Sequence, residues 1–445
     1  MSAARRFLLP AELSSVAVAA PQWPLWSLGL LVPLTLLLPL ALGTVLCLLL
    51  LALATVSQLA GRRPLPPALL RPLLPLAGLL LVGAFVGAGA EPYVWMRDAW
   101  YIVNPALYLA VGFVLARQAT DAARGLRALL LGCTVVALLH LSWLLRHPEL
   151  LGYSSVEVRT AIGPGFFAPV LALLLLLSHW RRWREGLRLP TGLAVAIGAV
   201  NAGSLALSYS RTLSVVFVVG ALAALGFLAR HEGRRLLLLS VLALAAVFTV
   251  RAFIDPASRE AELSMIGKFG RSFEEMRVTQ QLSRGEIERN WRGWETARAL
   301  SQWSDGGPAR WLFGEGLGAT VDMGVFQTLN RRPRDAVRFV PNFHNGYVFV
   351  LVKTGLFGAA LFIWFLWRLY QPGRLAARQD DDAGRRSQGR LLQGCVAALS
   401  LSTLIWFGLF HKVDLLPMML TVGFLLATLA GTSSPPSTST RGAHD

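Results

Sequence analysis

Apolar runs of about 18 residues or more recur along this 445-residue chain and set the first limit on its fold. A helix of that length crosses the hydrocarbon core of a bilayer, which is roughly 30 Å thick. The runs are continuous, whereas membrane β-strands alternate apolar and polar residues. We therefore expect an all-α, polytopic integral membrane protein. The first run begins near Leu25 without a small-residue cleavage site, so we expect a retained helix and not a removed signal peptide.

The hydropathy pattern predicts about twelve transmembrane helices. The first two share one apolar run from Leu25 to Ala60, which is too long for a single span, so we expect a tight hairpin near Pro39 and Leu40. The expected order is a nine-span membrane region (1–253), a large polar loop (254–341), a three-span membrane region (342–432) and a disordered tail (433–445). The predicted spans are 24–40, 41–60, 69–90, 99–116, 124–145, 161–180, 190–208, 211–230, 235–253, 342–369, 391–410 and 415–432.

Charge predicts the orientation of these spans. The chain has 42 Lys and Arg against 25 Asp and Glu, which gives a net charge of +17. The N-terminal tail and the loops on its side hold 21 of the Lys and Arg residues, and the short loops on the other side hold only 5. Because cytoplasmic loops carry the excess of positive charge, both termini are predicted to be cytoplasmic. The same rule explains most of the net charge, and no nucleic-acid-binding module is visible, so we expect no nucleic acid partner.

Neither the cysteines nor the acidic run of the chain predicts a metal site. Cys47, Cys133 and Cys395 all lie inside apolar segments, so we expect small core side chains with no disulfide. Residues 380–382 are three consecutive aspartates, but they lie among arginines in a predicted cytoplasmic loop. We therefore expect these three aspartates to be exposed to solvent and not to bind a metal.

The polar stretch 254–341 stands out because the other predicted connections are short. Loops of this length are usually functional or separately folded. Within it, Glu286–Leu300 is predicted to form an amphipathic helix, which would also suit the membrane surface. Residues 314–318 (Gly-Glu-Gly-Leu-Gly) predict a flexible turn. They lack the Lys-Ser/Thr of a phosphate loop, so we do not expect a nucleotide site.

Polar residues converge on the predicted outer face. His344 opens the span at 342–369, and an imidazole at a membrane–water boundary can act as a base near neutral pH. Lys353, inside the same span, is a lesser functional candidate. Several outer arginines oppose the positive-inside trend, although snorkelling or local pairing could explain any one of them. Together they predict a bound anion, because guanidinium groups match phosphate oxygens bidentately. These arginines are Arg159, Arg211, Arg284, Arg289 and Arg292.

These residues resemble the O-antigen ligase superfamily. His344-Asn345, nine residues, then Gly355-x-x-Gly358 is similar to the signature of that family. Further similar elements are Ser210-Arg211 at the start of a span, Trp294-x-x-Ala297, and the glycine-rich 314–318. The resemblance covers roughly residues 159–360 by motif and the whole chain by layout.

The resemblance implies a metal-independent, inverting glycosyltransferase at the periplasmic face of the Gram-negative inner membrane. Its partners would be an undecaprenyl-diphosphate-linked polysaccharide as donor, lipid A–core as acceptor, and membrane lipids, with no cofactor. His344 would be the catalytic histidine and Arg211 a diphosphate-binding arginine. The family's loop arginine usually precedes the tryptophan by four residues, where this chain has Asn290, so Arg289 is the nearest catalytic candidate. The implied substrate-binding residues are Arg159, Ser210, Arg284, Arg292, Trp294 and Asn345.

Three alternatives stay open. An O-antigen polymerase would use the same donor, but its family often carries two large outer loops with Arg-x10-Gly patterns, and this chain has one such match, at Arg259 and Gly270. A protein-glycosylating relative would be expected to have an extra C-terminal domain. A transporter or flippase would place polar residues near the bilayer midplane in related halves, and the sequence shows no such halves.

Overall fold

The computed structural model describes residues 26–60, 66–118, 121–152, 155–208, 210–227, 284–328, 336–379, 381–411 and 413–431. Within these ranges the chain is helical apart from connections and one two-stranded sheet. The predicted all-α fold class is therefore confirmed. The predicted span 235–253, the beginning of the large loop (254–283) and the predicted disordered tail lie outside the described residues.

Six helical segments of the described residues are long and apolar enough to cross a membrane, and the chain is therefore a membrane protein. Each predicted span except 235–253 coincides with one of these segments or with a shorter apolar helix, but the count of twelve stays a prediction. The long segments are α3 (Pro67–Val86), α4 (Pro92–Gln118), α5 (Ala122–Arg146), α17 (Gly346–Gln379), α18 (Ala383–Trp406), and η5 (Val413–Leu415) with α20 (Leu416–Gly431). The shorter helices are α1 (Trp26–Leu37), α2 (Leu40–Ala60), α7 (Phe167–Ser178), α9 (Thr191–Leu207) and α10 (Arg211–Ala224). Short turns connect them at η2 (Pro148–Gly152), α6 (Ser155–Ile162), α8 (Trp183–Gly186) and α19 (Gly408–His411).

Glycines set the closest helix contacts. A Cβ atom on Gly112 of α4 would lie 1.9 Å from the carbonyl oxygen of Leu420, and Gly423 of α20 faces α4 in the same way. Gly29 of α1 and Gly132 of α5 form a second reciprocal pair. Small residues allow such close backbone approach, which matters in a bilayer because lipid tails are as apolar as the helix surfaces. These pairs hold α20 against α4 and α1 against α5.

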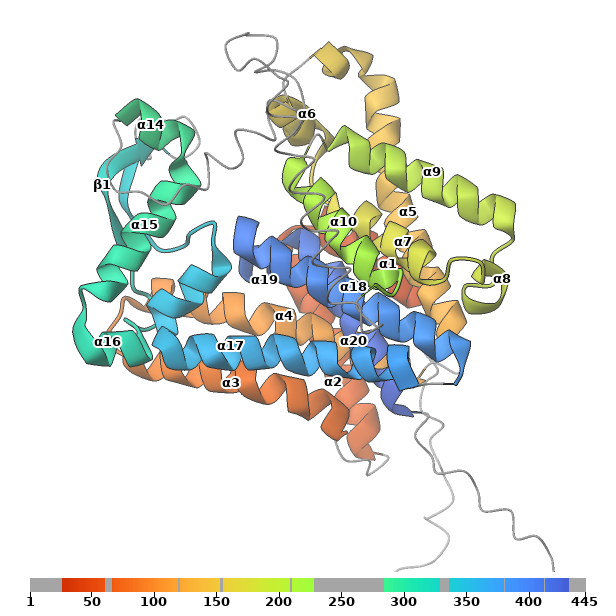
Figure 1. Ribbon diagram of the computed structural model, residues 1–445, viewed down its shortest axis with the longest axis horizontal. Coiled ribbons are helices and arrows are strands. Elements are labelled where there is room, and N and C mark those ends of the chain that lie inside the picture. The colour runs from red at the N-terminus through yellow and green to blue at the C-terminus, as the bar shows by residue number, and fades with distance from the viewer. Residues whose placement is uncertain are drawn as a thin grey trace, which may run out of the picture.

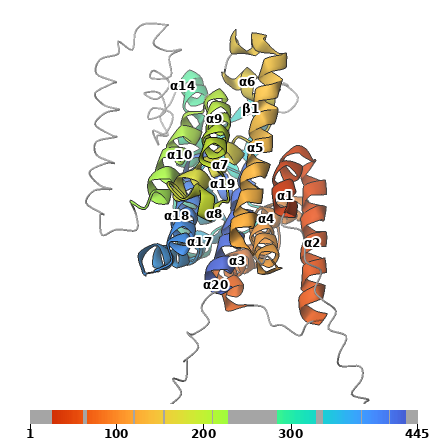
Figure 2. The same ribbon diagram turned by 90° about the vertical axis from the view of Figure 1, so that its right-hand side faces the viewer.

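The predicted hairpin near Pro39 and Leu40 is confirmed. Helix α1 ends at Leu37 and α2 begins at Leu40, where the long apolar run is interrupted. A Cβ atom on Gly43 would lie 3.6 Å from the Cα atom of Thr35, so the two helices are in contact beside the turn. Figure 2 shows α1 and α2 side by side.

The predicted span 161–180 is wrong at its N-terminal end. Gly163 and Gly165 have φ angles of 97° and 108°, so the chain breaks between α6 and α7. Helix α7 has only 12 residues, about 18 Å, and nearly all of them are buried in the protein. The Gly-Pro-Gly sequence at 163–165 is the physical reason, because proline and left-handed glycines do not continue a helix.

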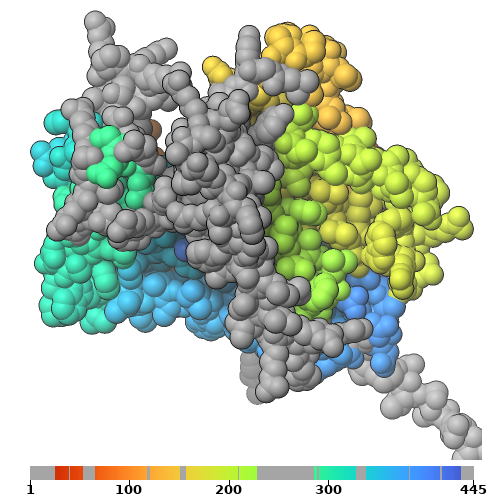
Figure 3. All heavy atoms as spheres, turned by 45° about the horizontal axis from the view of Figure 1, so that its top comes forward, coloured from red at the N-terminus to blue at the C-terminus, as the bar shows by residue number. Residues whose placement is uncertain are grey.

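Part of the large loop forms a folded unit at one end of α3, α4 and α17 (Figure 1). This polar unit, residues 284–340, contains α14 (Arg284–Arg289), α15 (Trp291–Ser304), α16 (Gly307–Phe313), β1 (Val321–Thr328) and β2 (Ala336–Val340). The strands pair antiparallel, and Arg338 donates to both carboxylate oxygens of Asp322 at 2.6 Å across the pair. Helix α15 confirms the amphipathic helix predicted there, whereas the sequence did not predict the two strands. Figure 3 shows the polar unit on one side of a face whose other side holds α5, α9 and α10.

The glycine-rich segment 314–318 attaches the polar unit to the membrane helices. The backbone N–H groups of Glu315 and Gly316 donate to carbonyl oxygens of α17, at 2.8 and 3.0 Å. The N–H of Leu317 donates to the carbonyl of Gly83 in α3 at 2.8 Å. The expectation of a flexible turn is therefore wrong, because successive N–H groups of this segment are all hydrogen-bonded.

Gly355 makes this attachment possible. Its φ of 65° and ψ of −166° interrupt α17, which leaves carbonyl groups just before it available to the glycine-rich segment. This backbone region is essentially restricted to glycine. A Cβ atom at Gly355 would also lie 2.3 Å from the backbone of Leu312. The first glycine of the Gly355-x-x-Gly358 signature is thus explained by the fold.

A buried ion pair joins α17 and α4 to the same glycine-rich segment. Lys353 of α17 and Asp98 of α4 lie 2.5 Å apart with side chains that are 1% and 0% exposed. The Asp98 carboxylate also accepts from the N–H of Gly318 at 2.8 Å, and the Lys353 ammonium donates to the carbonyl of Ala319. Lys353 therefore holds the glycine-rich segment in place, which is a structural role for this intramembrane charge.

We predict that Gly355→Ala destabilises the protein. The substitution forces a left-handed alanine against the Leu312 backbone, and such strain costs about 1–3 kcal/mol. Thermal unfolding in detergent should show a lower melting temperature. The control is Gly192→Ala in α9, where a Cβ atom would meet nothing within 4 Å. Equal melting temperatures for the two variants would contradict the assigned role of Gly355.

Candidate functional site

His344 lies directly before α17, as predicted, and its backbone is fixed from two sides. Its N–H donates to the carboxylate of Glu295 at 3.1 Å, and its carbonyl accepts from the N–H of Phe407. Phe407 follows the end of α18 in a left-handed conformation, with φ of 60°. These two bonds fix His344 between the polar unit and the membrane helices. The imidazole is 39% exposed and therefore stays accessible.

Glu295 of α15 also binds the His344 side chain. One carboxylate oxygen lies 2.6 Å from Nδ1, and the other accepts from the indole N–H of Trp291. The Glu295 side chain is only 4% exposed. An ionised carboxylate can only accept, so it keeps the imidazole proton on Nδ1 and leaves the lone pair on Nε2. No described residue forms a hydrogen bond with Nε2, so this nitrogen is available to a substrate hydroxyl.

Two of the predicted arginines, Arg159 and Arg292, line one pocket, and a third, Arg211, lies near enough to Arg159 to affect its pKa. The pocket has a volume of about 350 Å³ and is lined by Arg159 of α6, Arg292 of α15 and the start of α10. Burial, and then the neighbouring guanidinium groups of Arg292 and Arg211, lower the pKa of Arg159. The two smaller causes show that Arg292 and Arg211 carry their charges close to Arg159, and a bound anion would be attracted by all three.

The helix break at 163–165 and the start of α10 shape this pocket. Gly163, Pro164, Ser210 and Thr212 line it. Ser210 accepts from the N–H of Leu213 at 3.3 Å and so caps α10. The N-terminus of a helix carries a partial positive charge and favours bound anions. The cap and the arginines therefore add positive potential at the same place.

The arginine pocket and His344 are connected through two segments, α15 and the end of α18. Arg292 and Glu295 are three residues apart on α15, so their side chains start on the same face with Cβ atoms roughly 5–6 Å apart. Trp406, which lines the pocket, directly precedes the Phe407 that binds the His344 carbonyl. The pocket and the imidazole are therefore held by two common segments, α15 and the end of α18.

Asp414 is the one acidic residue among the described residues that line the arginine pocket. Its carboxylate accepts from the N–H of Gly165 at 2.8 Å, which fixes the break between α6 and α7. His140 holds the same break from the other side, at 3.0 Å from the Pro164 carbonyl. These contacts give the pocket a preformed backbone wall.

Two predicted substrate-binding residues have internal partners. The Asn345 side chain accepts from the N–H groups of Tyr347 and Val348 at 3.1 and 3.2 Å, so it caps α17. Trp294 is 7% exposed, and its indole N–H donates to the carbonyl of Met323 in β1 at 3.0 Å. These bonds give both residues positioning roles, and direct substrate contact stays a prediction.

Of the three predicted loop arginines, the structure describes the side chain of Arg292 alone. Arg292 lines the pocket together with Arg159, whereas the side chains of Arg284 and Arg289 lie outside the described atoms of α14. The catalytic assignment of Arg289 therefore stays a prediction. Arg292 is the loop arginine that the described geometry places beside the other two.

Sequence reasoning missed Glu295. The amphipathic pattern over Glu286–Leu300 comes from Ile287, Trp291, Trp294 and Ala297, and Glu295 lies beside the same apolar stripe. A carboxylate in the buried stripe of a helix needs a partner, because burying an unpaired charge is costly. The position of Glu295 beside the apolar stripe could have indicated a buried, paired carboxylate. Its partner, His344, is 49 residues away in the sequence and could not be identified from the pattern.

The described residues contain no group of three or more His, Cys, Asp or Glu side chains that could hold a metal ion. The three cysteines are buried, as predicted. The described site brings an imidazole bound by a carboxylate near a group of guanidinium side chains.

No protein-family model matches the chain, and no curated protein sequence matches it. The functional interpretation consequently rests on the residues of the site and on the motifs of the sequence.

We predict that Arg159→Cys and Arg292→Cys can be crosslinked by a short bismaleimide, because both side chains line one pocket. The native cysteines are buried and should not compete. The crosslink would be detected as a band shift after cleavage in the loop between them. In the control, Arg310→Cys on α16 replaces Arg292→Cys, because α16 and α6 lie at distant corners of the molecule (Figure 1). Crosslinking of the control pair alone would contradict the described position of α15.

Proposed function

We propose that this protein is an O-antigen ligase-type glycosyltransferase. It transfers a polysaccharide from undecaprenyl diphosphate to lipid A–core at the periplasmic face of a Gram-negative inner membrane. In this proposal the chain has twelve spans with both termini in the cytoplasm, and the polar unit lies in the periplasm. The observation that carries the proposal is the Glu295–His344 pair near the pocket of Arg159 and Arg292, with Arg211 close to Arg159.

The proposed reaction is a direct displacement. Nε2 of His344 takes the proton of an acceptor sugar hydroxyl, and that oxygen forms a bond to the anomeric carbon of the donor sugar. The bond from this carbon to the diphosphate oxygen breaks, and undecaprenyl diphosphate leaves with the electron pair. Attack opposite the leaving group inverts the anomeric configuration. Glu295 stabilises the imidazolium that forms, as a carboxylate does in other histidine-base sites.

The arginine pocket supports the leaving-group step. Negative charge develops on the diphosphate as the glycosidic bond breaks, and fixed guanidinium groups stabilise it without a metal ion. Arg159 of α6 and Arg292 of the polar unit line the pocket, and Arg211 of α10 lies close to Arg159, so the pocket is complete only when that unit is docked. The energy of the reaction comes from the lipid diphosphate, so the proposal requires no nucleotide site.

The test is product analysis with purified protein, lipid-linked polysaccharide and lipid A–core. The active protein should produce a ladder on lipid A–core, and His344→Ala should reduce its rate by about 10²–10⁴-fold, the usual contribution of a positioned base. His147→Ala is the matched control, since that histidine pairs with Glu149 outside the site. Longer chains on the lipid carrier with untouched core would instead identify a polymerase. The absence of any covalent product would support transport.

We predict that Arg292→Gln lowers kcat by roughly 10²–10³-fold, the effect of removing one fixed charge-stabilising donor. The matched control is Arg298→Gln on the same helix, whose guanidinium donates to the Asp322 carbonyl at 3.0 Å and does not line the pocket. Steady-state kinetics should separate the two variants. Equal losses of kcat in the two variants would contradict the proposal, because activity would then depend on the total charge of α15 and not on the pocket.

We predict that Glu295→Gln lowers kcat with little change in KM. The new amide can donate to Nδ1, which moves the imidazole proton to Nε2 and blocks the base. Glu295→Asp should recover part of the activity because it restores an acceptor. Melting temperature and the 159–292 crosslink report whether the polar unit stays docked. A parallel loss of activity and crosslinking would assign Glu295 a purely structural role.

A further inference from the structure

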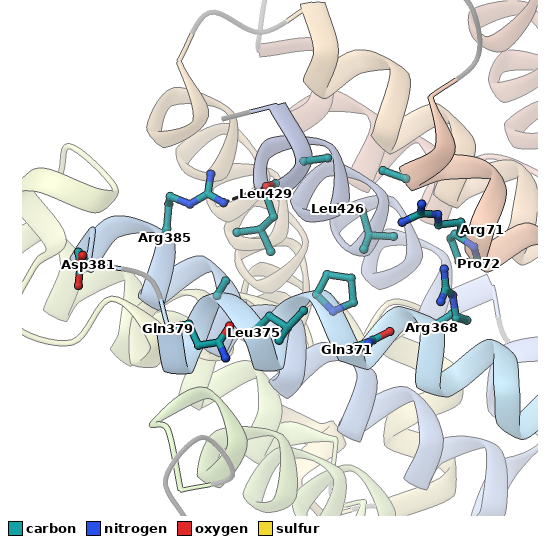
Figure 4. Close-up of a pocket in the computed structure, with 14 residues that line it drawn as sticks. Arg71, Pro72, Arg368, Gln371, Leu375, Gln379, Asp381, Arg385, Leu426 and Leu429 are labelled. Carbon is teal, nitrogen blue, oxygen red and sulfur yellow. Dashed lines mark hydrogen bonds between the residues drawn. The ribbon is translucent and has the colours of Figure 1, made fainter. Parts of the chain in front are cut away.

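A second pocket lies far from the candidate active site. Its volume is about 940 Å³, and it is enclosed by α3, α17, α18 and α20 (Figure 4). Its charged lining is made of Arg71, Arg368, Arg385 and Asp381, so three positive groups face one negative group. An excess of two positive charges in a pocket between apolar helices selects for an anion.

The pocket lies at the opposite end of the helices from the polar unit. On α3, Arg71 is 12 residues from Gly83, which binds the glycine-rich segment, and this corresponds to about 18 Å along a helix. On α17, Arg368 is 13 residues beyond Gly355, about 20 Å. These separations are most of the roughly 30 Å thickness of a bilayer core, so the pocket lies near the other membrane surface.

Arg71 and Arg368 are not neutralised within the described part of the chain. Figure 4 shows both side chains at one end of the pocket, and neither forms a hydrogen bond or ion pair with a described residue. Arg385 lies at the other end and donates to the carbonyl of Leu429 at 3.0 Å. Asp381 is at that far end in Figure 4, away from Arg71 and Arg368. Two guanidinium groups without a carboxylate between them form a fork for phosphate oxygens.

The surroundings of the pocket are those of a lipid headgroup region. Leu375, Leu426 and Leu429 supply apolar lining, and Leu375 is 47% exposed on the outer face of α17. Trp367, next to Arg368, is 45% exposed on the same helix. Exposed tryptophans mark the boundary between headgroups and acyl chains. A ligand with both an anionic head and apolar chains therefore matches the pocket better than a free anion.

We propose that this pocket binds the headgroup phosphate of an anionic membrane phospholipid, with Arg71 and Arg368 as its main ligands. The acyl chains extend along the exposed apolar face of α17. Basic pockets between transmembrane helices at a membrane surface commonly hold such headgroups. The site is separate from the proposed glycosyl transfer and does not depend on it.

The experiment is native mass spectrometry of the full-length protein with added phosphatidylglycerol, or with phosphatidylethanolamine of the same acyl chains. Arg71→Gln with Arg368→Gln should weaken phosphatidylglycerol binding by roughly 10- to 30-fold, which follows from the usual contribution of each basic residue. Arg117→Gln with Arg374→Gln is the charge-matched control, because neither residue lines the pocket. Arg71→Lys with Arg368→Lys keeps the charge and should retain most of the binding, which excludes misfolding as the cause.

Specific retention of phosphatidylglycerol that only the first variant loses would support the proposal. Equal losses in the control variant would overturn it, because binding would then follow net charge alone. Equal retention of phosphatidylethanolamine would also overturn it. A third arm adds inorganic phosphate in excess: displacement of the lipid at modest concentrations would show a free-phosphate site instead of a lipid site.

Discussion

The docking of the glycine-rich segment into α17 is the constraint on which the rest of the structure depends. Gly355 interrupts a long apolar helix, and backbone groups freed inside a membrane must find partners. The N–H groups of Glu315 and Gly316 bind two carbonyls of α17, and the Lys353–Asp98 pair closes the junction. Removing one member of a buried pair typically costs about 3–5 kcal/mol, because the remaining charge is left unpaired. The junction is therefore specific as well as stable.

This junction brings the two halves of the candidate site together. The membrane helices supply His344, Arg211 and the helix break beside Arg159, while the polar unit supplies Glu295 and Arg292. Neither half contains both an oriented base and a full anion pocket. Fixing the polar unit on α3, α4 and α17 sets the positions of these charges in advance, and the proposed electrostatic catalysis requires such preorganised charges.

Sequence periodicity was sufficient for the parts of the fold that depend on local hydropathy. It predicted the all-α class, the α1–α2 hairpin at Pro39, the amphipathic helix α15 and the position of His344 at the start of α17. It could not predict the late start of α7 after the break at Gly163–Gly165, or the β1–β2 pair. It also missed Glu295, because the contacts that define the site join residues tens to hundreds of positions apart.

The central claim is that the outer arginines and the Glu295–His344 pair form one site for a lipid-linked diphosphate. The most direct measurement is a cryo-electron microscopy structure of the full-length protein with a non-hydrolysable lipid diphosphate donor. The account predicts density for the diphosphate among Arg159, Arg211 and Arg292, with the adjoining sugar facing Nε2 of His344. Diphosphate bound instead at Arg71 and Arg368, or His344 turned away from Glu295 and the sugar, would contradict it.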